Sequence, residues 1–287
     1  MPADFAASSI PNRRQVPEMY EVLEVALADT PRLFQYHQAG VYGAQFNLKG
    51  FAYPWLVSSR KWSKGDRVLD VGAGYSELPV HLAEAFGCET WVVDEFGVAS
   101  GEPFWKRGRE PQEHIRARPQ VNYVLERLGD PARSSLPPDS FDCIYSLSTL
   151  EHVPRTSIVA VWQHMERLLR PGGEMLHAVD LGLPVKSGLP SVLKALAIDT
   201  LFPLMPSSAR LGFVYHTPHA YARFVVQSIL KSPMRHDRLL NVTRLLLDPE
   251  VVSESMENTY NRIIKDGMTG VRHVKKGTLL LRLRKAA

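Results

Sequence analysis

The 287-residue sequence contains only two cysteines, Cys88 and Cys143, so it cannot form a framework of several disulfides. This scarcity favours a reducing, cytoplasmic compartment. The sequence also lacks a strong charge imbalance, because 34 Lys and Arg stand against 30 Asp and Glu. Such a small basic excess gives no reason to expect a nucleic acid as partner. What is left is a chain of ordinary globular composition, long enough to bury a core without crosslinks.

Long hydrophobic runs are missing as well. The most apolar stretch, residues 189–205, is interrupted by Lys194 and Asp199 and reaches Pro203 near its end. It therefore falls short of the roughly 18 uninterrupted apolar residues that a membrane-spanning helix needs. The N-terminus also lacks the basic start and apolar centre of a secretory signal. We expect no membrane partner, and we interpret the apolar stretch as a lid or core helix.

From Arg67 onward, short apolar runs alternate with helix-like stretches. The runs that predict strands are Arg67–Val71, Thr90–Asp94, Val121–Leu125, Phe141–Leu147, Glu174–Val179, Asn241–Leu247 and Thr278–Leu283. The segments with helical spacing are Pro17–Ala28, Glu77–Phe86, Ser157–Leu169 and Pro249–Lys265. Alternation of this kind predicts an α/β fold in which a parallel sheet carries helices on both faces.

These patterns divide the chain into four segments. Residues 1–64 are predicted to form an N-terminal helical cap rich in aromatic side chains, and residues 65–182 to form the ligand-binding core. The stretch 183–240 is much longer than a minimal crossover of about 10–12 residues. We interpret it as an insertion after the fifth strand that covers the substrate. Residues 241–287 are predicted to complete the sheet with two strands.

A glycine turn between the first core strand and its helix carries the strongest chemical signal. In Asp70-Val71-Gly72-Ala73-Gly74, the glycines allow a tight turn and a close approach to a ligand, and the following helix offers N–H groups. Asp94 comes twenty residues after Gly74, at the end of the next strand. Its carboxylate is suitably placed for both ribose hydroxyls of a nucleotide-like ligand, with Glu95 as the alternative.

The residues around this turn also distinguish between nucleotides. A dinucleotide-binding turn has a third glycine where this sequence has Glu77. A carboxylate at that position would repel a pyrophosphate. Asp70, by contrast, stands two residues before Gly72, where an acid suits a cationic ligand such as an amino-acid-bearing sulfonium. The turn therefore favours S-adenosylmethionine over NAD as the ligand. An NAD-linked enzyme is kept as an alternative function.

Several motifs together resemble the class I S-adenosylmethionine-dependent methyltransferases, in particular their small-molecule branch of type 11. The motifs are the turn at residues 70–74, Asp94, Phe141–Ser146, Leu150–Val153 and Leu168–Gly173. They cover about residues 65–182, and their specificity lies in the set, since each motif alone is weak. The resemblance implies a Rossmann-like, seven-stranded and mostly parallel sheet whose last strand, Thr278–Leu283, runs antiparallel.

The same resemblance implies which residues hold S-adenosylmethionine. The turn would wrap the methionine part, the acid after the second strand would hold the ribose, and a further acid would accept a hydrogen bond from the adenine amino group. The end of the fourth strand would face the methionine part. The residues carried over in this way are Asp70, Gly72, Ala73, Gly74, Asp94, Glu95, Asp130, Ser146 and Leu147.

Three residues are candidates for catalysis. His152 follows the fourth strand and suits removal of a hydroxyl proton near neutral pH, although family members without a histidine base also carry this Glu-His-Val run. Asp180, at the carboxyl end of the fifth strand, is a candidate substrate contact, as is Glu151 next to His152. His177, in the same strand as Asp180, fits a core histidine better than a catalytic one.

These observations predict a methyltransferase that methylates a hydroxyl oxygen of a small molecule. A sugar or saccharide is the first candidate, because the run from His177 to Leu181 resembles a segment of methyltransferases in polysaccharide pathways. A secondary metabolite or a quinone-type ring, methylated at oxygen or carbon, is the alternative acceptor. The other alternative is a non-catalytic cofactor-binding protein with the same fold.

Two further properties stay open at this level. Glu151, Asp94, Glu95 and Asp180 offer the carboxylate oxygens that Mg²⁺ prefers, but their spacing supports no metal site, and none is predicted. The sequence also leaves open which atom of the acceptor is methylated and the oligomeric state, with a homo-oligomer among the options.

Overall fold

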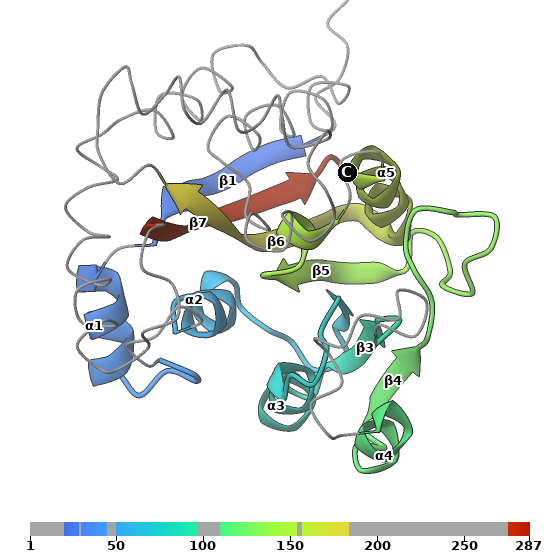
Figure 1. Ribbon diagram of the computed structural model, residues 1–287, viewed down its shortest axis with the longest axis horizontal. Helices are drawn as coiled ribbons and strands as arrows, with labels where there is room; N and C mark the ends of the chain where they lie inside the picture. The colour runs from blue at the N-terminus through green and yellow to red at the C-terminus, as the bar shows by residue number, and fades with distance from the viewer. Residues whose placement is uncertain (1–19, 29, 45–49, 97–109, 154–156, 184–274) are drawn as a thin grey trace, which may run out of the picture.

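The structure of the chain is a computed structural model that describes residues 20–28, 30–44, 50–96, 110–153, 157–183 and 275–287 (Figure 1). Its elements are β1 (Tyr20–Leu27), α1 (Thr30–Gln38), α2 (Ala52–Ser59), β2 (Arg67–Val71), α3 (Leu78–Phe86), β3 (Glu89–Val93), α4 (Pro111–Arg116), β4 (Val121–Val124), β5 (Phe141–Leu147), the 3-10 helix η2 (Leu150–His152), α5 (Ile158–Leu168), β6 (Leu169–Leu183) and β7 (Lys275–Lys285). The elements β2, α3, β3, β4, β5 and α5 follow the predicted runs closely, whereas α4 was not predicted and β6 is longer than the predicted strand Glu174–Val179.

Seven strands form one sheet in the order β1-β7-β6-β5-β2-β3-β4. β7 runs antiparallel to both of its neighbours, β1 and β6, whereas the pairs from β6 across to β4 are parallel. The predicted mostly parallel sheet with the antiparallel strand at Thr278–Leu283 is confirmed, and the seven described strands include β1, which was not predicted as a strand. Because the carboxyl ends of the parallel strands meet at one edge, a ligand site is expected along that edge.

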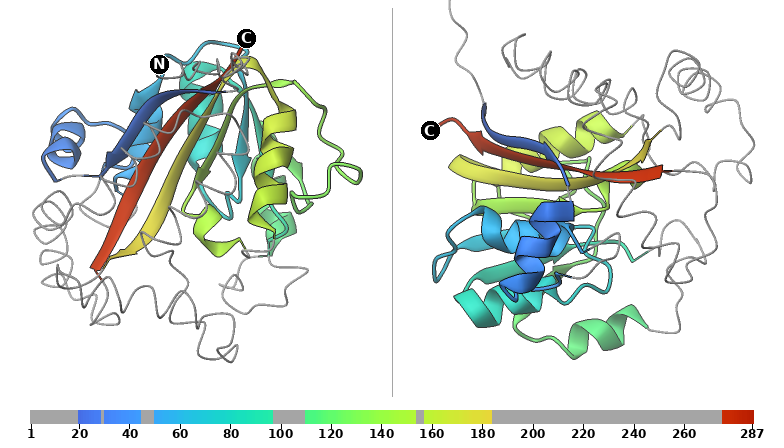
Figure 2. Two further views of the ribbon diagram at one scale, coloured as in Figure 1. Left: turned by 90° about the horizontal axis from the view of Figure 1, so that it is seen from above. Right: turned by 90° about the vertical axis from the view of Figure 1, so that its left-hand side faces the viewer.

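Helices cover both faces of the sheet, as predicted (Figures 1 and 2). α5 covers one face, where Trp162 packs in a cluster with Leu69. α1, α2 and α3 cover the other, where Trp55 packs in a cluster with Val68. Val68 and Leu69 are neighbours in β2, and successive residues of a strand point to opposite faces. Each therefore joins a different core cluster.

The N-terminal segment differs from its prediction, because residues 20–27 form strand β1 and not part of a helix over Pro17–Ala28. β1 pairs with β7 along the edge of the sheet, and the register shifts between Val22 and Glu24. Leu23 is thus the extra residue of a β-bulge, which breaks the alternation of apolar and polar residues. Because of the bulge, the apolar residues of this strand have the spacing of a helix. The hydrogen bonds to β7 stabilise the strand instead.

The other predictions for the two ends of the chain are met in part. β1 and β7 come from the predicted segments 1–64 and 241–287, yet both belong to the same sheet as the core. The predicted strand Asn241–Leu247, the helix Pro249–Lys265 and the insertion 183–240, apart from its first residue, lie outside the described residues. Within the part of the chain that the structure describes, no helix is both long and apolar enough to cross a membrane.

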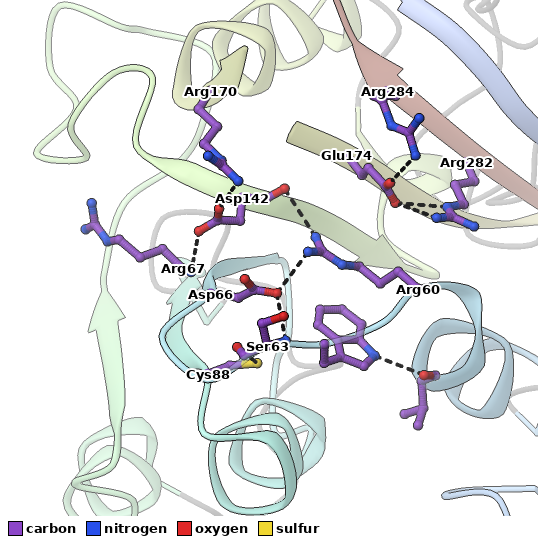
Figure 3. Close-up of polar contacts among 12 residues, drawn as sticks. Arg60, Ser63, Asp66, Arg67, Cys88, Asp142, Arg170, Glu174, Arg282 and Arg284 are labelled. Atoms are coloured by element: carbon purple, nitrogen blue, oxygen red, sulfur yellow. Dashed lines mark hydrogen bonds and ion pairs between the residues drawn. The ribbon is translucent and has the colours of Figure 1, made fainter. Parts of the chain in front are cut away.

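Charged side chains join the strands at the amino ends of β2 and β5, the edge opposite the expected ligand site (Figure 3). Arg60 donates to Asp66 at 2.9 Å and to the carbonyl of Asp142 at 3.2 Å. The Asp142 carboxylate accepts from the backbone N–H of Arg67 at 2.7 Å and pairs with Arg170 at 2.6 Å. This edge is occupied by contacts that hold the sheet together.

Glu174 extends these contacts to β7 (Figure 3). Its carboxylate accepts hydrogen bonds from Arg282 at 2.9 Å and from Arg284 at 3.0 Å. Burial by itself raises the pKa of Glu174, but the hydrogen bonds from the two arginines outweigh burial and bring this pKa below its ordinary value. The ionised carboxylate therefore stabilises the pairing of β6 with β7.

We expect Glu174→Gln to lower the free energy of unfolding by about 1–3 kcal/mol at neutral pH, the usual contribution of hydrogen bonds to charged groups. Since the pKa of Glu174 is lower in the folded protein than in the unfolded chain, its contribution is complete above roughly pH 4.3 and is lost as the pH falls through the folded-state pKa. Urea unfolding at several pH values should therefore show the difference shrinking in acid.

The matched control for this experiment is Glu21→Gln. Glu21 pairs with the same Arg284, at 3.3 Å, but its side chain is 58% exposed. An exposed pair contributes about 0–1 kcal/mol. Equal losses in the two variants, or a loss in Glu174→Gln that does not depend on pH, would contradict this account.

Candidate cofactor-binding and catalytic site

The glycine turn lies at the carboxyl end of β2, where the chain enters α3. Gly72 and Gly74 have φ angles of 75° and 55°, in the left-handed region that glycine adopts readily. A Cβ atom added to Gly72 would lie 2.2 Å from Cγ2 of Thr149. The hydroxyl of Thr149 also donates to the Gly72 carbonyl at 3.1 Å, and the Gly72 N–H donates to the Val93 carbonyl at 2.9 Å. The turn is therefore held by β3 on one side and by the loop after β5 on the other.

Asp94 follows β3 and holds the turn directly. Its Oδ2 accepts the N–H of Gly74 at 2.7 Å, and its Oδ1 accepts the N–H of Phe96 at 2.6 Å. Burial raises the pKa of Asp94 in spite of these two hydrogen bonds. Each carboxylate oxygen has a further lone pair, so Asp94 keeps acceptor capacity for hydroxyl groups of a ligand. The structure thus brings together the turn and the acid predicted to hold a ribose.

Asp70 lies in β2, two residues before the turn, in register with Tyr145 of β5. It is 3% exposed, and its Oδ1 has no hydrogen-bond partner among the described residues. Burial raises the pKa of Asp70 well above its ordinary value; a hydrogen-bonding interaction with Tyr145 lowers this pKa by less, and the nearby charge of Asp94 raises it further. A buried carboxylate with an oxygen that lacks a hydrogen-bond partner is unfavourable, so a positively charged group beside this turn would be favoured.

The start of α3 differs from what the sequence predicts. The N–H of Leu78 is already bonded to Oγ of Ser76 at 3.2 Å, and Pro79, in the first turn of the helix, has no N–H. Glu77 at the N-cap carries a carboxylate that is paired with Arg118. The first turn of α3 is thus poorly equipped to bind a phosphate, which normally needs free N–H groups at this position.

The two other predicted acids have protein partners. Glu95, next to Asp94, pairs with Arg127. Asp130 lies on the surface and pairs with Arg133 at 3.3 Å, and the N–H of the preceding Gly129 donates to Nδ1 of His164 in α5 at 3.1 Å. The structure therefore holds Asp130 beside α5, and its predicted contact with adenine stays a prediction.

Ser146, at the end of β5, is fully buried, and its Oγ lies 2.8 Å from Nδ1 of His177 in β6. The ring of His177 lies 5.2 Å from that of Trp162 in α5, and burial lowers the pKa of His177 to about 3. The predicted placement of His177 in the core is confirmed. The hydroxyl of Ser146 faces this core, so the backbone of Ser146 and the half-buried Leu147 are what this strand end presents to a ligand.

The catalytic candidates lie in different environments. His152 and Glu151 belong to η2, directly after β5, where His152 is exposed and Glu151 is only 4% exposed. Asp180 lies in β6, in register with Thr278 of β7, and its side chain is outside the described residues. Nowhere in the described ranges do three or more His, Cys, Asp or Glu side chains gather closely enough to hold a metal ion.

Thr149 is a residue of this site that sequence analysis missed. It binds the Gly72 carbonyl and occupies the space in which a side chain at Gly72 would lie. The available signal was its place two residues after β5, at the same edge of the sheet as the glycine turn. That signal identifies a location, whereas the contact with Gly72 depends on how β2 and β5 pair.

Comparisons with known proteins agree with this geometry. A family model described as a methyltransferase domain matches residues 48–217, more than half of the chain. The 27-O-demethylrifamycin SV methyltransferase of Amycolatopsis mediterranei (strain S699) is 29% identical over 126 residues, which are 44% of this chain and 42% of that protein. The aligned part therefore spans less than half of the relative's length.

Two solved structures show distant likenesses. The geranyl diphosphate C-methyltransferase from Streptomyces coelicolor A3(2), in complex with Mg²⁺, geranyl-S-thiolodiphosphate and S-adenosyl-L-homocysteine, is 12% identical, with a TM-score of 0.44 and coverage of 85% of this chain and 81% of that chain. The phosphoethanolamine N-methyltransferase 2 of Haemonchus contortus, in complex with S-adenosyl-L-methionine, is 17% identical, with a TM-score of 0.42 and coverage of 89% and 57%. Both are too distant to carry an argument about the acceptor.

The packing of the glycine turn leads to a stability prediction. Gly72→Ala should lower the free energy of unfolding by about 2–5 kcal/mol, since a left-handed residue with a side chain costs about 1–2 kcal/mol and overpacking against Thr149 about 1–3 kcal/mol more. Gly172→Ala is the matched control, because Gly172 has a φ of 73° and nothing within 4 Å of an added Cβ. Urea unfolding should show only the smaller decrease in the free energy of unfolding for Gly172→Ala. Similar decreases in the two variants would mean that the Thr149 side chain can move aside without destabilising the protein.

Proposed function

The chain belongs to the methyltransferase domain family, and from this we propose that it transfers a methyl group from S-adenosylmethionine to a hydroxyl oxygen of a small molecule. The observation that carries the proposal is a glycine turn flanked by a buried acid, Asp70, and a half-buried acid, Asp94. Asp70 lies before the turn with an unpartnered Oδ1 within the described part of the chain, and Asp94 binds the N–H of Gly74. A cation bound at the turn would stabilise the ionised form of both acids.

The residues of the turn fit this cofactor. S-adenosylmethionine carries a sulfonium and an ammonium group in its methionine part, and two hydroxyls on its ribose. Asp70 would stabilise the positive charge, Asp94 would accept from the ribose hydroxyls, and the backbone of Gly72 to Gly74 would lie against the methionine part. A dinucleotide fits less well, because Pro79 has no N–H to offer a pyrophosphate and Ser76 occupies the N–H of Leu78.

When bound, the cofactor supplies a methyl group on a good leaving group. The protein's part is to align the acceptor oxygen with that methyl group, which contributes up to roughly 7–11 kcal/mol in favourable cases, and to take the hydroxyl proton. We assign the proton to His152, which is exposed on η2 beside the carboxyl end of β5. Glu151 is buried, so we give it no direct part, and Asp180 remains a candidate contact for the acceptor.

The class of acceptor is a finer proposal. The likeness to saccharide-modifying enzymes rests on the run that contains His177, which is fully buried and does not reach a ligand. It rests also on the insertion 183–240. The relative from Amycolatopsis mediterranei is named for a rifamycin acceptor, which supports a hydroxyl-bearing secondary metabolite. We therefore propose a small-molecule hydroxyl as acceptor and place saccharides and secondary metabolites side by side in the test.

We also propose the cytoplasm as the compartment. Cys88 and Cys143 are both free and buried. Burial raises the pKa of Cys88 to about 11 and that of Cys143 to about 12. Since the thiolate is the reactive form, both residues suit unreactive core positions in a reducing environment.

The cofactor half of the proposal is tested by calorimetric titration with S-adenosylmethionine from about pH 8 down to about pH 5.5. Burial raises the pKa values of Asp70 and Asp94, so these acids take up protons as the pH falls, and affinity for a cation should decrease. Asp70→Asn should bind about tenfold or more weakly at pH 8, in line with the loss of a charged partner, and should depend less on pH.

Asp139→Asn is the control for this titration, because the Asp139 side chain is 60% exposed and pairs with Lys285 away from the turn. It should bind like the wild type. If Asp70→Asn also binds like the wild type at every pH, the acid has no part in cofactor binding. If NADH binds and S-adenosylmethionine does not, the proposed cofactor is wrong.

The transfer half is tested by mass spectrometry on panels of saccharides and hydroxyl-bearing secondary metabolites, where a product heavier by one methylene group is expected. His152→Ala should lower kcat by about 10²–10⁴-fold, the usual contribution of a general base, and leave the affinity for S-adenosylmethionine within about twofold. His37→Ala is the control, since His37 is an exposed histidine in α1 that contacts the carbonyl of Ala44 at 3.0 Å.

Two outcomes would count against the transfer step as proposed. Binding of S-adenosylmethionine without turnover on any hydroxyl compound would favour the non-catalytic alternative. Full turnover by His152→Ala would show that another group takes the proton or that none is needed.

A further inference from the structure

An aromatic cluster lies beside the glycine turn and plays no part in the chemistry described so far. Tyr75, which follows Gly74, has its ring 5.4 Å from that of Phe96 and 5.0 Å from that of His114, the latter at an edge-on angle of 88°. Tyr123 of β4 closes the cluster, with its ring 5.8 Å from His114 and its hydroxyl 3.2 Å from Nε2 of His114. Edge-on contacts of this kind are favourable for aromatic rings.

The cluster fixes α4 against the strand ends. His114 is 4% exposed, although it belongs to a short surface helix. Its carbonyl accepts a hydrogen bond from Arg118 at 3.0 Å. The same Arg118 donates through Nε to the Glu77 carboxylate at 2.9 Å and pairs with it through a second nitrogen. Arg118 thus ties the end of α4 to the start of α3.

These contacts form a closed circuit around the turn. Asp94 binds the N–H groups of Gly74 and Phe96 with its two oxygens. Phe96 has a φ of 50°, unusual for a residue with a side chain, and its ring packs against Tyr75. Tyr75 packs against His114, and the chain returns to the turn through Arg118 and Glu77. The contact between Asp94 and the Gly74 N–H reaches the turn itself, and the other links hold Tyr75 and Glu77, which follow the turn directly in the chain.

We propose that Tyr75, His114 and Arg118 are positioning residues that hold the glycine turn and Asp94 in the conformation that binds the cofactor. Glycine-containing turns lose much conformational entropy when they become ordered. If the turn is already ordered in the free protein, ligand binding does not have to supply the free energy of ordering it. The affinity is then higher without any new contact. The identity of the ligand rests on the proposed function; the ordering of the turn does not.

The first experiment uses the full chain without any ligand. Hydrogen exchange should be measured at the amides of Gly74 and Phe96, the two groups that donate to Asp94. Tyr75→Leu and Arg118→Gln should exchange at these amides roughly two- to tenfold faster than the wild type, as expected for loss of one aromatic contact or one charged pair. Tyr75→Phe keeps the ring and should exchange like the wild type.

The second experiment measures binding of S-adenosylmethionine and S-adenosylhomocysteine by calorimetry in the same variants. Affinity should fall by a similar factor for both ligands in Tyr75→Leu and in Arg118→Gln, while kcat at saturating cofactor stays within about twofold. Arg116→Gln is the matched control. Arg116 is the last residue of α4, two residues before Arg118; it is exposed and donates to the carbonyl of Gln112.

The Glu77–Arg118 pair allows a sharper test. Glu77→Gln and Arg118→Gln should each weaken binding, and the double variant should be no weaker than Arg118→Gln alone, because the loss of Arg118 already removes its contact with Glu77. If Tyr75→Leu does not fold, this cycle carries the test, since both side chains lie at the surface of the cluster with exposures of 49% and 17%.

The outcomes separate the inference from the proposed function. A wild-type protein that binds neither ligand overturns the proposed function. Wild-type binding that is matched by Tyr75→Leu and Arg118→Gln, with unchanged exchange at Gly74 and Phe96, overturns the positioning role. Faster exchange and weaker binding in these two variants, with Arg116→Gln and Tyr75→Phe unaffected, support it, and a loss in Arg116→Gln of equal size overturns it.

Discussion

The hydrogen bond from the Gly74 N–H to the Asp94 carboxylate is the contact on which the site depends. Its length is 2.7 Å. It joins a turn that must remain free of side chains to an acid that must remain able to accept hydrogen bonds from a ligand. A carboxylate accepting from backbone N–H groups is held in one orientation while lone pairs stay available. The same acid fixes Phe96, so one side chain organises the carboxyl ends of β2 and β3.

Ion pairs that stabilise the sheet lie at the amino ends of its parallel strands, whereas the candidate binding site lies at their carboxyl ends. At the amino ends, Asp66, Asp142 and Glu174 each have an arginine partner at close range. At the carboxyl ends, Asp70 is buried with an oxygen that has no partner in the described part of the chain. Buried charges are tolerated when paired and unfavourable when not. The contrast within one sheet marks the edge where a ligand has to supply the missing charge.

Much of the fold could be predicted because the parallel strands are buried on both faces and give continuous apolar runs, and the distance from Gly74 to Asp94 follows from one strand–helix–strand unit. β1 could not, because the bulge at Leu23 breaks its alternation and its partner β7 lies more than 250 residues away. The direction of the Ser146 hydroxyl was missed for a related reason. The alternation of side chains along a strand predicts which face a side chain points to, but not which residues cover that face. Tyr75 and His114 meet only through tertiary packing, so no local spacing connects them.

The position of β7 has a consequence for how the protein is made. Residues 275–285 lie between β6 and β1, so neither neighbour can pair with them until the ribosome has synthesised the chain that separates β6 from β7. Until then β6 presents an open edge of hydrogen-bonding groups, the kind of surface that recruits other chains. We expect the nascent protein to rely on chaperones during this interval. Stalling or truncation shortly before residue 275 should leave β6 exposed to aggregation, even though the glycine turn and Asp94 have already been synthesised.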